Sequence, residues 1–385
     1  MIRKPRAAVG RGAARGLEGR RPRRPKAVVA MSGGVDSSVA AALLVAQGYD
    51  VTGIMLKLWR GEANTNSGCC NLGAADDARR VADVLGIPFY VFNFADRFEE
   101  TVVRNFHDDY AAGRTPNPCV RCNQWIKFDS LLERTRALGA EVLATGHYAR
   151  VVERDGGMRV LRGVDRRKDQ SYVLWMLSQD ELAHVRFPVG GMAKTETRAL
   201  AAELGLRTAA KPDSQEICFV RAGDLGAYVD ANMPAAATPG DIVDARGRAV
   251  GKHRGLGRYT VGQRKGLGIS LGAPVYVTSI DAIDNRIVVG SRDELAVGGI
   301  VMAETSFVGA AAQPGAPVLV QHRAHGDVSR ATVGRAADDR LELRFESPVE
   351  AVAPGQSAAL YSATDPEELL GGGVIMATAP VQAVA

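Results

Sequence analysis

Short apolar runs alternate with longer amphipathic stretches through the first half of the chain. Period-2 or continuous apolar runs predict strands, and apolar residues spaced three or four apart predict helices. Strands are expected at 26–31, 50–58, 89–94 and 141–145, and helices at 39–46, 74–86, 96–112, 128–139 and 173–177. Strands that alternate with helices predict a parallel, doubly wound α/β sheet.

The pattern changes at Pro239 to short apolar runs separated by Gly, Pro and Asp. Such runs at short intervals predict a small closed β-barrel, and its strands are expected at 286–289, 318–321, 341–345 and 357–361. The predicted order is a basic disordered tail (1–26), a catalytic α/β domain (27–222), a small β-rich central domain (223–288) and a C-terminal β-barrel (289–385).

Charge is distributed unevenly over the 385 residues. Residues 1–26 hold ten Lys/Arg and one Glu, a net charge of +9. The whole chain has a net charge of +5, so residues 27–385 carry −4. The tail lacks apolar periodicity and is predicted to be disordered; an RNA-contacting arm, a transit peptide, an upstream-start artefact and a dispensable extension all fit it. Any RNA-binding surface elsewhere must be local.

The five cysteines are odd in number and no apolar stretch is long enough to span a bilayer. This composition argues against a disulfide framework and favours a reducing cytoplasm. The cysteines are therefore expected to be reactive, metal-binding or buried; they are Cys69, Cys70, Cys119, Cys122 and Cys218.

A glycine- and serine-rich segment, Ser32–Ser38, joins the first predicted strand to the first helix. Backbone N–H groups at a helix N-terminus favour anions, and Gly33 and Gly34 let a phosphate approach the backbone. Asp36 could orient this loop or face a magnesium ion. Ligands of such sheets bind beyond the carboxyl ends of the strands, where Met55 and the segment Gly146–Tyr148 also fall.

Three further polar stretches carry candidate chemistry. Residues 113–123 are predicted to form a loop because Gly113, Pro116 and Pro118 interrupt regular structure, and this loop holds a C-x-x-C pair. The others are Lys168–Tyr172 and Asp213–Phe219, which contains Cys218. Two thiol sites beside a phosphate loop indicate sulfur handling, because a thiolate both attacks sulfane sulfur and carries it as a persulfide.

A basic segment, Gly251–Gly268, has six glycines and no acidic residue. With Tyr259 it suits phosphate contact and base stacking, although a solvated basic loop is the plainer interpretation. His322 and His325 are expected at the surface, since no cysteine or acid completes a metal site with them.

Seven motifs in order resemble the tRNA-specific 2-thiouridylase family, from about residue 27 to the C-terminus. They are Ser32–Ser38, Gly146–Tyr148, Lys168–Tyr172, Phe187–Gly190, Ser214–Phe219, Tyr259–Leu267 and Pro354–Gln356. The resemblance implies an adenine nucleotide alpha-hydrolase-like fold and ATP-dependent 2-thiolation of the wobble uridine of tRNA.

The resemblance also implies roles for individual residues. ATP, with Mg²⁺, would be bound by Ala30, Met31, Ser32, Gly33, Gly34, Val35, Asp36, Ser37, Met55 and Gly146. Cys218 would carry the persulfide, received from a relay protein or desulfurase, and Cys122 would form a disulfide with it or help to release sulfide. Contacts to tRNA fall on Asn117, Pro118, Cys119, His147, Lys168, Asp169, Gln170, Arg323 and Gln356. A monomer in the cytoplasm is expected.

Cys119 departs from the family pattern, because many relatives carry Asp at this position. Cys119, Cys122 and Cys218 could instead ligate three irons of a four-iron–four-sulfur cluster, whose fourth iron would bind hydrosulfide. Two other functions remain open: a different adenylating ligase or amidotransferase with the same loop, and a non-catalytic tRNA-binding protein with a relict ATP loop.

Overall fold

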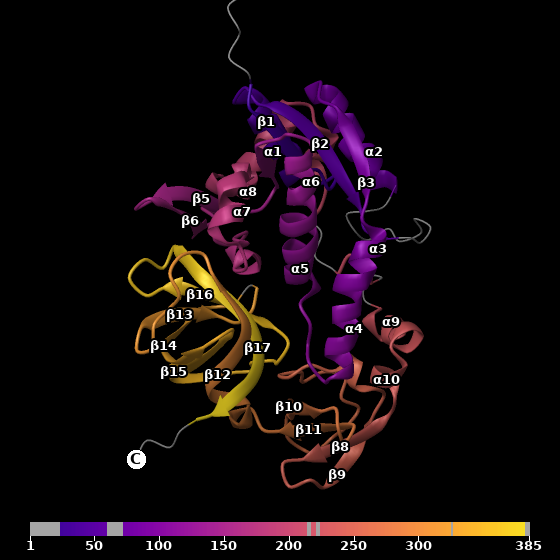
Figure 1. Cartoon of the computed structure of the whole chain (residues 1–385). Coiled ribbons are helices and arrows are strands. Elements are labelled where there is room, and N and C mark those ends of the chain that lie inside the picture. Colours follow the sequence, from indigo (N-terminus) through magenta and orange to yellow (C-terminus); the bar gives the residue numbers. More distant parts are fainter. Residues whose placement is uncertain (1–23, 60–71, 214–216, 221–223, 325, 382–385) are drawn as a thin grey trace, which may run out of the picture.

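The computed structural model (Figure 1) places an α/β unit above two smaller β-rich units. The structure describes residues 24–59, 72–213, 217–220, 224–324 and 326–381. Within these ranges no helix is long and apolar enough to cross a membrane. The tail up to residue 23 and the pair Cys69 and Cys70 lie outside the described residues.

A five-stranded parallel sheet forms the α/β unit. Its strands are β1 (Lys26–Ala30), β2 (Asp50–Lys57), β3 (Phe89–Asn93), β4 (Val142–Ala144) and β7 (Val185–Arg186), in the order β3-β2-β1-β4-β7. The helices α1 (Val35–Ala46), α2 (Leu72–Leu85) and α8 (Lys194–Glu203) belong to the same unit. The predicted α/β fold is confirmed. The strand order reverses at β1, and a ligand crevice is expected at its carboxyl end.

Two long helices extend from this sheet toward the β-rich units (Figure 1). The first runs through α3 (Ala95–Phe98), the π-helical η1 (Glu99–Val103) and α4 (Arg104–Ala111), and the second through α5 (Pro118–Arg121), the π-helical η2 (Cys122–Leu131) and α6 (Leu132–Ala137). The prediction of a loop over 113–123 was therefore wrong from Pro118 onward. Pro118 occupies the first helical position, where no N–H is needed, and the Asn117 side chain caps the helix by accepting from the Val120 N–H.

The predicted helix 173–177 is also corrected. The structure has a short 3₁₀ turn, η3 (Ser171–Leu174), in which Val173 departs from helical geometry. The Asp169 carboxylate accepts from the Ser171 N–H (3.1 Å) and hydroxyl (2.9 Å). Trp175 is fully buried in the largest apolar cluster, so tertiary packing overrides the helical pattern here.

The central unit is a four-stranded sheet in the order β10-β11-β8-β9. Its strands are β8 (Gly240–Asp244), β9 (Ala249–His253), β10 (Tyr276–Asp281) and β11 (Arg286–Gly290), preceded by α9 (Leu225–Asn232) and α10 (Pro234–Ala237). The run 286–289, predicted as a barrel strand, is β11 and pairs with β8 and β10 instead. Its apolar pattern does not distinguish between two neighbouring sheets.

The predicted C-terminal β-barrel is confirmed. It comprises β12 (Ala296–Phe307), β13 (Pro317–Gln321), β14 (Ser329–Ala337), β15 (Arg340–Glu350), β16 (Ser357–Ser362) and β17 (Glu368–Pro380). Neighbours are antiparallel, and pairing of β12 with β17 closes the barrel.

A hairpin from the first half of the chain joins this barrel. β5 (Ala149–Arg154) pairs with β6 (Gly157–Arg162), and β6 pairs with β17 at Leu161↔Glu368 and Val160↔Leu369. The remaining short elements are α7 (Gln179–His184), η4 (Pro188–Gly191), η5 (Arg207–Ala210), η6 (Leu256–Arg258) and η7 (Asp293–Leu295). The domain boundaries given above stay predictions.

Candidate active site

The Ser32–Ser38 segment forms a tight turn between β1 and α1. Gly33 has φ +71°, and a Cβ there would lie 2.2 Å from the carbonyl oxygen of Ala74, so a side chain does not fit. The Ser32 N–H donates to the Ser37 hydroxyl (3.2 Å), and the Ser37 and Ser38 hydroxyls donate to the Gly34 carbonyl at 3.2 and 2.8 Å. These bonds hold the loop over the first turn of α1.

The sequence-predicted ATP residues come together at the carboxyl ends of three neighbouring strands. The Met31 N–H donates to the carbonyl of Ile54, the residue before Met55 on β2 (2.8 Å). Gly146 follows β4, and a Cβ on it would lie 2.6 Å from the Ser37 nitrogen. The loop, Met55 and Gly146 therefore share one region of the sheet, as the sequence predicts.

Asp36 is held by groups that the sequence did not single out as partners. Both its carboxylate oxygens accept from Lys194 Nζ (2.7 and 2.8 Å), and Oδ1 also accepts from the Tyr148 hydroxyl (2.8 Å). Burial and the neighbouring Asp36 raise the pKa of Tyr148 above its ordinary value. Magnesium takes one or two carboxylates together with phosphate oxygens; Asp36 is the carboxylate that the loop offers, and Lys194 pairs with both its oxygens here.

Asp213 connects this loop region to the segment that carries Cys218. It pairs with Lys168 and Lys194 at 2.8 Å and with Arg198 at 2.9 Å. Partial burial acts against ionisation, yet hydrogen bonds from Lys168 and Lys194 lower the pKa of Asp213 to about 2. Residues 214–216 lie outside the described part of the chain.

Lys211 adds another cation at the loop. Its Nζ donates to the Gly33 carbonyl (2.9 Å) and pairs with Asp77 (2.8 Å). With Lys194, this places two ammonium groups against the Ser32–Ser38 turn. Such groups, together with the N-terminus of α1, suit a polyphosphate.

The three described cysteines differ in exposure: Cys119 is exposed, Cys122 is buried and Cys218 is half-buried. Cys122 belongs to the largest apolar cluster, and Cys218 packs against the same cluster. Phe219 anchors Cys218 there, with ring centroids 5.6 Å from Phe98 and 5.1 Å from Phe106. The two predicted catalytic thiols thus contact the same apolar cluster.

The structure does not gather the three described thiols around a single metal ion. Across the described ranges no three side chains of His, Cys, Asp or Glu gather so that they could hold a metal ion. Cys119, Cys122 and Cys218 all fall within those ranges.

The residues predicted to contact tRNA differ in exposure and fall into three groups. Cys119, Gln170 and Arg323 are exposed. Pro118, His147 and Asp169 are buried: His147 packs between Phe128 and Phe187, and burial lowers its pKa well below the ordinary value. Asp169 accepts from Arg162 (2.8 Å) and the Gly163 N–H (2.9 Å).

The other three predicted tRNA contacts make hydrogen bonds within the protein. Asn117 caps α5, Lys168 pairs with Asp213, and the Gln356 side-chain amide donates to the carbonyls of Thr115 (2.9 Å) and Pro116 (3.1 Å). As positioned here, they brace the site.

Two aromatic predictions are corrected. Tyr259 is 5% exposed and packs edge-on against His253, so it offers no face for base stacking in this conformation. His322 is 8% exposed rather than at the surface, because it directly follows the buried strand β13; His325 lies outside the described residues.

In the basic segment, Lys252 pairs with Asp241 (2.7 Å) and Arg258 with Asp230.

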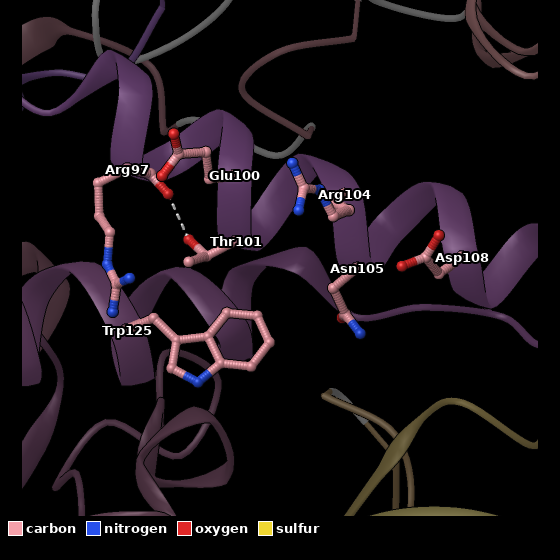
Figure 2. Close-up of a pocket in the computed structure, with 7 residues that line it drawn as sticks. All are labelled: Arg97, Glu100, Thr101, Arg104, Asn105, Asp108 and Trp125. Atoms are coloured by element: carbon pink, nitrogen blue, oxygen red, sulfur yellow. Dashed lines mark hydrogen bonds between the residues drawn. The ribbon is translucent and has the colours of Figure 1, made fainter.

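A pocket of about 280 Å³ lies between the two long helices (Figure 2). Its lining mixes both signs of charge around one indole ring: Arg97, Glu100, Thr101, Arg104, Asn105, Asp108 and Trp125. It adjoins the helix that carries Cys122.

Comparisons with known proteins cover nearly the whole chain. Residues 25–222 match the family model "tRNA methyl transferase HUP domain", 227–291 "tRNA methyl transferase PRC-barrel domain" and 297–375 "Aminomethyltransferase beta-barrel domain". The "tRNA-specific 2-thiouridylase MnmA" of Clostridium acetobutylicum is 44% identical over 91% of this chain and 99% of its own. That of Geobacter metallireducens is 47% identical over 91% of this chain and 97% of its own. A 4-thiouridine synthetase–RNA complex with bound ATP aligns with 51% of this chain and 45% of its own, at 19% identity and a TM-score of 0.34.

Proposed function

Because the chain belongs to the tRNA-specific 2-thiouridylase family, we propose that it uses ATP to replace the C2 oxygen of the wobble uridine of tRNA with sulfur. The observation that carries this proposal is identity of 44% over 91% of this chain and 99% of a curated relative. The enzyme is thus a tRNA-uridine sulfurtransferase. We expect it to act as a monomer in the cytoplasm.

The first step is adenylation of the base. The uridine C2 oxygen attacks the α-phosphorus of ATP, the bond to the β-phosphate breaks, and pyrophosphate leaves. The Ser32–Ser38 turn, Lys194 and Lys211 would hold the phosphates, and Asp36 would hold Mg²⁺, which neutralises phosphate charge when bound. Adenylation makes the C2 oxygen a good leaving group.

The second step transfers sulfur. Cys218 receives sulfur from a relay protein or a desulfurase as a persulfide, whose terminal sulfur attacks C2, and AMP leaves with the oxygen. The Cys122 thiolate then attacks the Cys218 sulfur and breaks its bond to the base-bound sulfur. The products are 2-thiouridine and a Cys122–Cys218 disulfide, which an external dithiol reduces before the next turnover.

Reconstitution tests the proposal with ATP, tRNA, a persulfide-forming desulfurase and dithiothreitol. Mass spectrometry of the digested tRNA is expected to detect 2-thiouridine with the wild-type enzyme. Cys218→Ser should abolish 2-thiouridine while tRNA binding and ATP–pyrophosphate exchange continue. Cys119→Ser is the matched control and should keep single-turnover thiolation at saturating tRNA, because Cys119 is a predicted tRNA contact and not a sulfur carrier. Full thiolation by Cys218→Ser would refute the sulfur carrier, and iron-dependent activity after anaerobic purification would refute the persulfide route.

A further inference from the structure

A buried arginine lies between the two cysteines of the C-x-x-C pair in the sequence. Arg121 lies on α5 directly before Cys122, and its side chain is 6% exposed. Its guanidinium donates to Asn105 Oδ1 (3.3 Å) and Gln124 Oε1 (3.0 Å) and lies 4.7 Å from the centre of the Trp125 ring. Asn105 and Trp125 both line the pocket in Figure 2. A buried charge of this kind requires a counter-ion.

That counter-ion comes from the barrel. Glu304 of β12 accepts two hydrogen bonds from Arg121, with Nη1–Oε2 at 2.6 Å and Nη2–Oε1 at 2.7 Å. This bidentate geometry fixes orientation as well as distance. The two residues are 183 positions apart in the sequence, and the pair is a direct link between the barrel and the cysteine-bearing helix.

The backbone at Glu304 is itself unusual. Glu304 has φ +52°, in the left-handed region that non-glycine residues adopt only at a cost. It lies where the pairing of β12 with β17 shifts register between Ala303 and Ser306. Such a β-bulge re-aims a side chain, and here the side chain it carries reaches Arg121.

A second barrel contact holds the chain on the other side of Cys119. The Thr115 N–H donates to the Pro354 carbonyl (2.8 Å), and Gln356 donates to the carbonyls of Thr115 and Pro116. The barrel therefore binds the chain both before α5 and at its last residue.

We propose that Arg121 and Glu304 are positioning residues for sulfur transfer, in that their ion pair sets the place of the Cys122 thiol relative to Cys218. This inference rests on the proposed function. The hydrogen bonds of Arg121 go to Asn105, Gln124 and Glu304, none of which belongs to the Ser32–Ser38 turn, so we expect adenylation to continue without the pair. Glu304 remains 47% exposed, which leaves its other side open to RNA bound on the barrel.

The test is a double-mutant cycle with Glu304→Gln, Arg121→Met and the double variant. Each single variant is expected to lower single-turnover thiolation by about 10- to 100-fold, since displacement of a reacting group by about 1 Å costs that much. ATP–pyrophosphate exchange and the KM for tRNA should stay within about twofold. The double variant should be no slower than Arg121→Met alone, because the two side chains act as a unit.

Glu350→Gln is the matched control, since Glu350 forms an exposed barrel ion pair with Arg292 (2.9 Å). It should thiolate like wild type. Trapping of the Cys122–Cys218 disulfide by mass spectrometry supplies a second readout, and Glu304→Gln should accumulate it more slowly.

Three results would overturn the inference while leaving the proposed function intact: wild-type thiolation by Glu304→Gln, losses that multiply in the double variant, or equal losses of exchange and thiolation. Failure of the wild-type enzyme to thiolate tRNA would refute the proposed function itself.

Discussion

At the scale of single residues, ion pairs between buried or half-buried side chains set the positions of the charged groups at the site. Lys194 bridges Asp36 at the loop and Asp213 ahead of the Cys218 segment. A carboxylate with three cationic partners is stabilised as the anion. Asp213 is therefore expected to contribute to stability as well as to the geometry of the site.

Replacement of Asp213 tests this expectation through pH. The lowered pKa of Asp213, about 2 against an ordinary 3.8, means that its stabilising effect is present above about pH 4 and lost as pH falls toward 2. Asp213→Asn should lower the free energy of unfolding at pH 7 by about 1 kcal/mol after allowance for solvent screening. Urea denaturation at several pH values measures this. A difference that stays constant from pH 5 down to pH 2.5 would contradict it.

His322 acts in the same direction as Asp213 but over a higher pH range. Burial and the neighbouring Arg323 lower the pKa of His322 to about 4, so between about pH 6.5 and 4 the unfolded chain binds a proton that the folded chain does not. Stability contributed by neutral His322 is thus lost as pH falls through this range. Between pH 7 and 5, the free energy of unfolding of His322→Gln should fall by about 2 kcal/mol less than that of the wild-type protein. Parallel denaturation curves of the two proteins check this, with equal decreases as the contrary result.

The residue-level site was partly predictable. The Ser32–Ser38 motif is local in sequence, and its glycine turn and helix N-terminus indicate phosphate binding without a structure. Lys194 lies 158 positions from Asp36, and no local pattern marks a lysine that pairs across such a distance. Arg121 and Glu304 escaped prediction for the same reason.

Among the elements, loop conformation and helix boundaries decide where functional groups lie. The sequence pattern predicts that the helix from Pro118 to Ala137 begins only at Phe128, because Pro116 and Pro118 indicate a break. Proline at the first turn is compatible with a helix, and Asn117 completes the cap. Cys122 consequently lies on a rigid helix rather than on a loop, which suits a thiol that must meet Cys218.

The turn between β1 and α1 can be tested with matched glycine substitutions. Gly33→Ala should weaken ATP binding by at least about tenfold, because its Cβ would meet the Ala74 carbonyl and displace the loop. Gly86 has a similar φ of +65°, and among described atoms none lies within 4 Å of a Cβ there. Gly86→Ala should therefore lower stability by about 1 kcal/mol and leave ATP affinity unchanged. Isothermal titration with ATP distinguishes the two, and equal affinities would contradict this account of the loop.

At the scale of the whole molecule, the barrel is closed and also contacts the chain that leads into α5. Gly355 has φ +91°, and a Cβ there would lie 2.8 Å from the backbone nitrogen and oxygen of Thr115. The turn 354–356 thus packs directly against the chain that leads into α5. The spacing of the apolar runs predicts a barrel. It does not predict the pairing of β17 with β6, because the two residue pairs that form it are far apart in sequence.

Gly355→Ala should disturb the packing of the 354–356 turn against Thr115 and leave the barrel folded. We expect thiolation to fall about tenfold while ATP–pyrophosphate exchange continues, because the displaced segment precedes Cys119 and is not part of the ATP turn. Gly315→Ala is the control: Gly315 has φ +85°, and among the described residues no atom lies within 4 Å of a Cβ there. Equal thiolation by both variants in the reconstituted assay would contradict the expected role of the 354–356 turn.

The pairing of β6 with β17 affects the order in which parts of the protein can fold during synthesis. Leu161 leaves the ribosome about 200 residues before Glu368, which corresponds to roughly 10–40 s at ordinary rates of synthesis. During that interval the outer edge of β6 lacks its final neighbour, whereas the parallel sheet and the loop for ATP are complete once the chain as far as Lys211 has emerged. The nascent chain is therefore expected to hold a folded nucleotide site before it holds a complete one for sulfur transfer, and its open strand edge is a place where a chaperone would act.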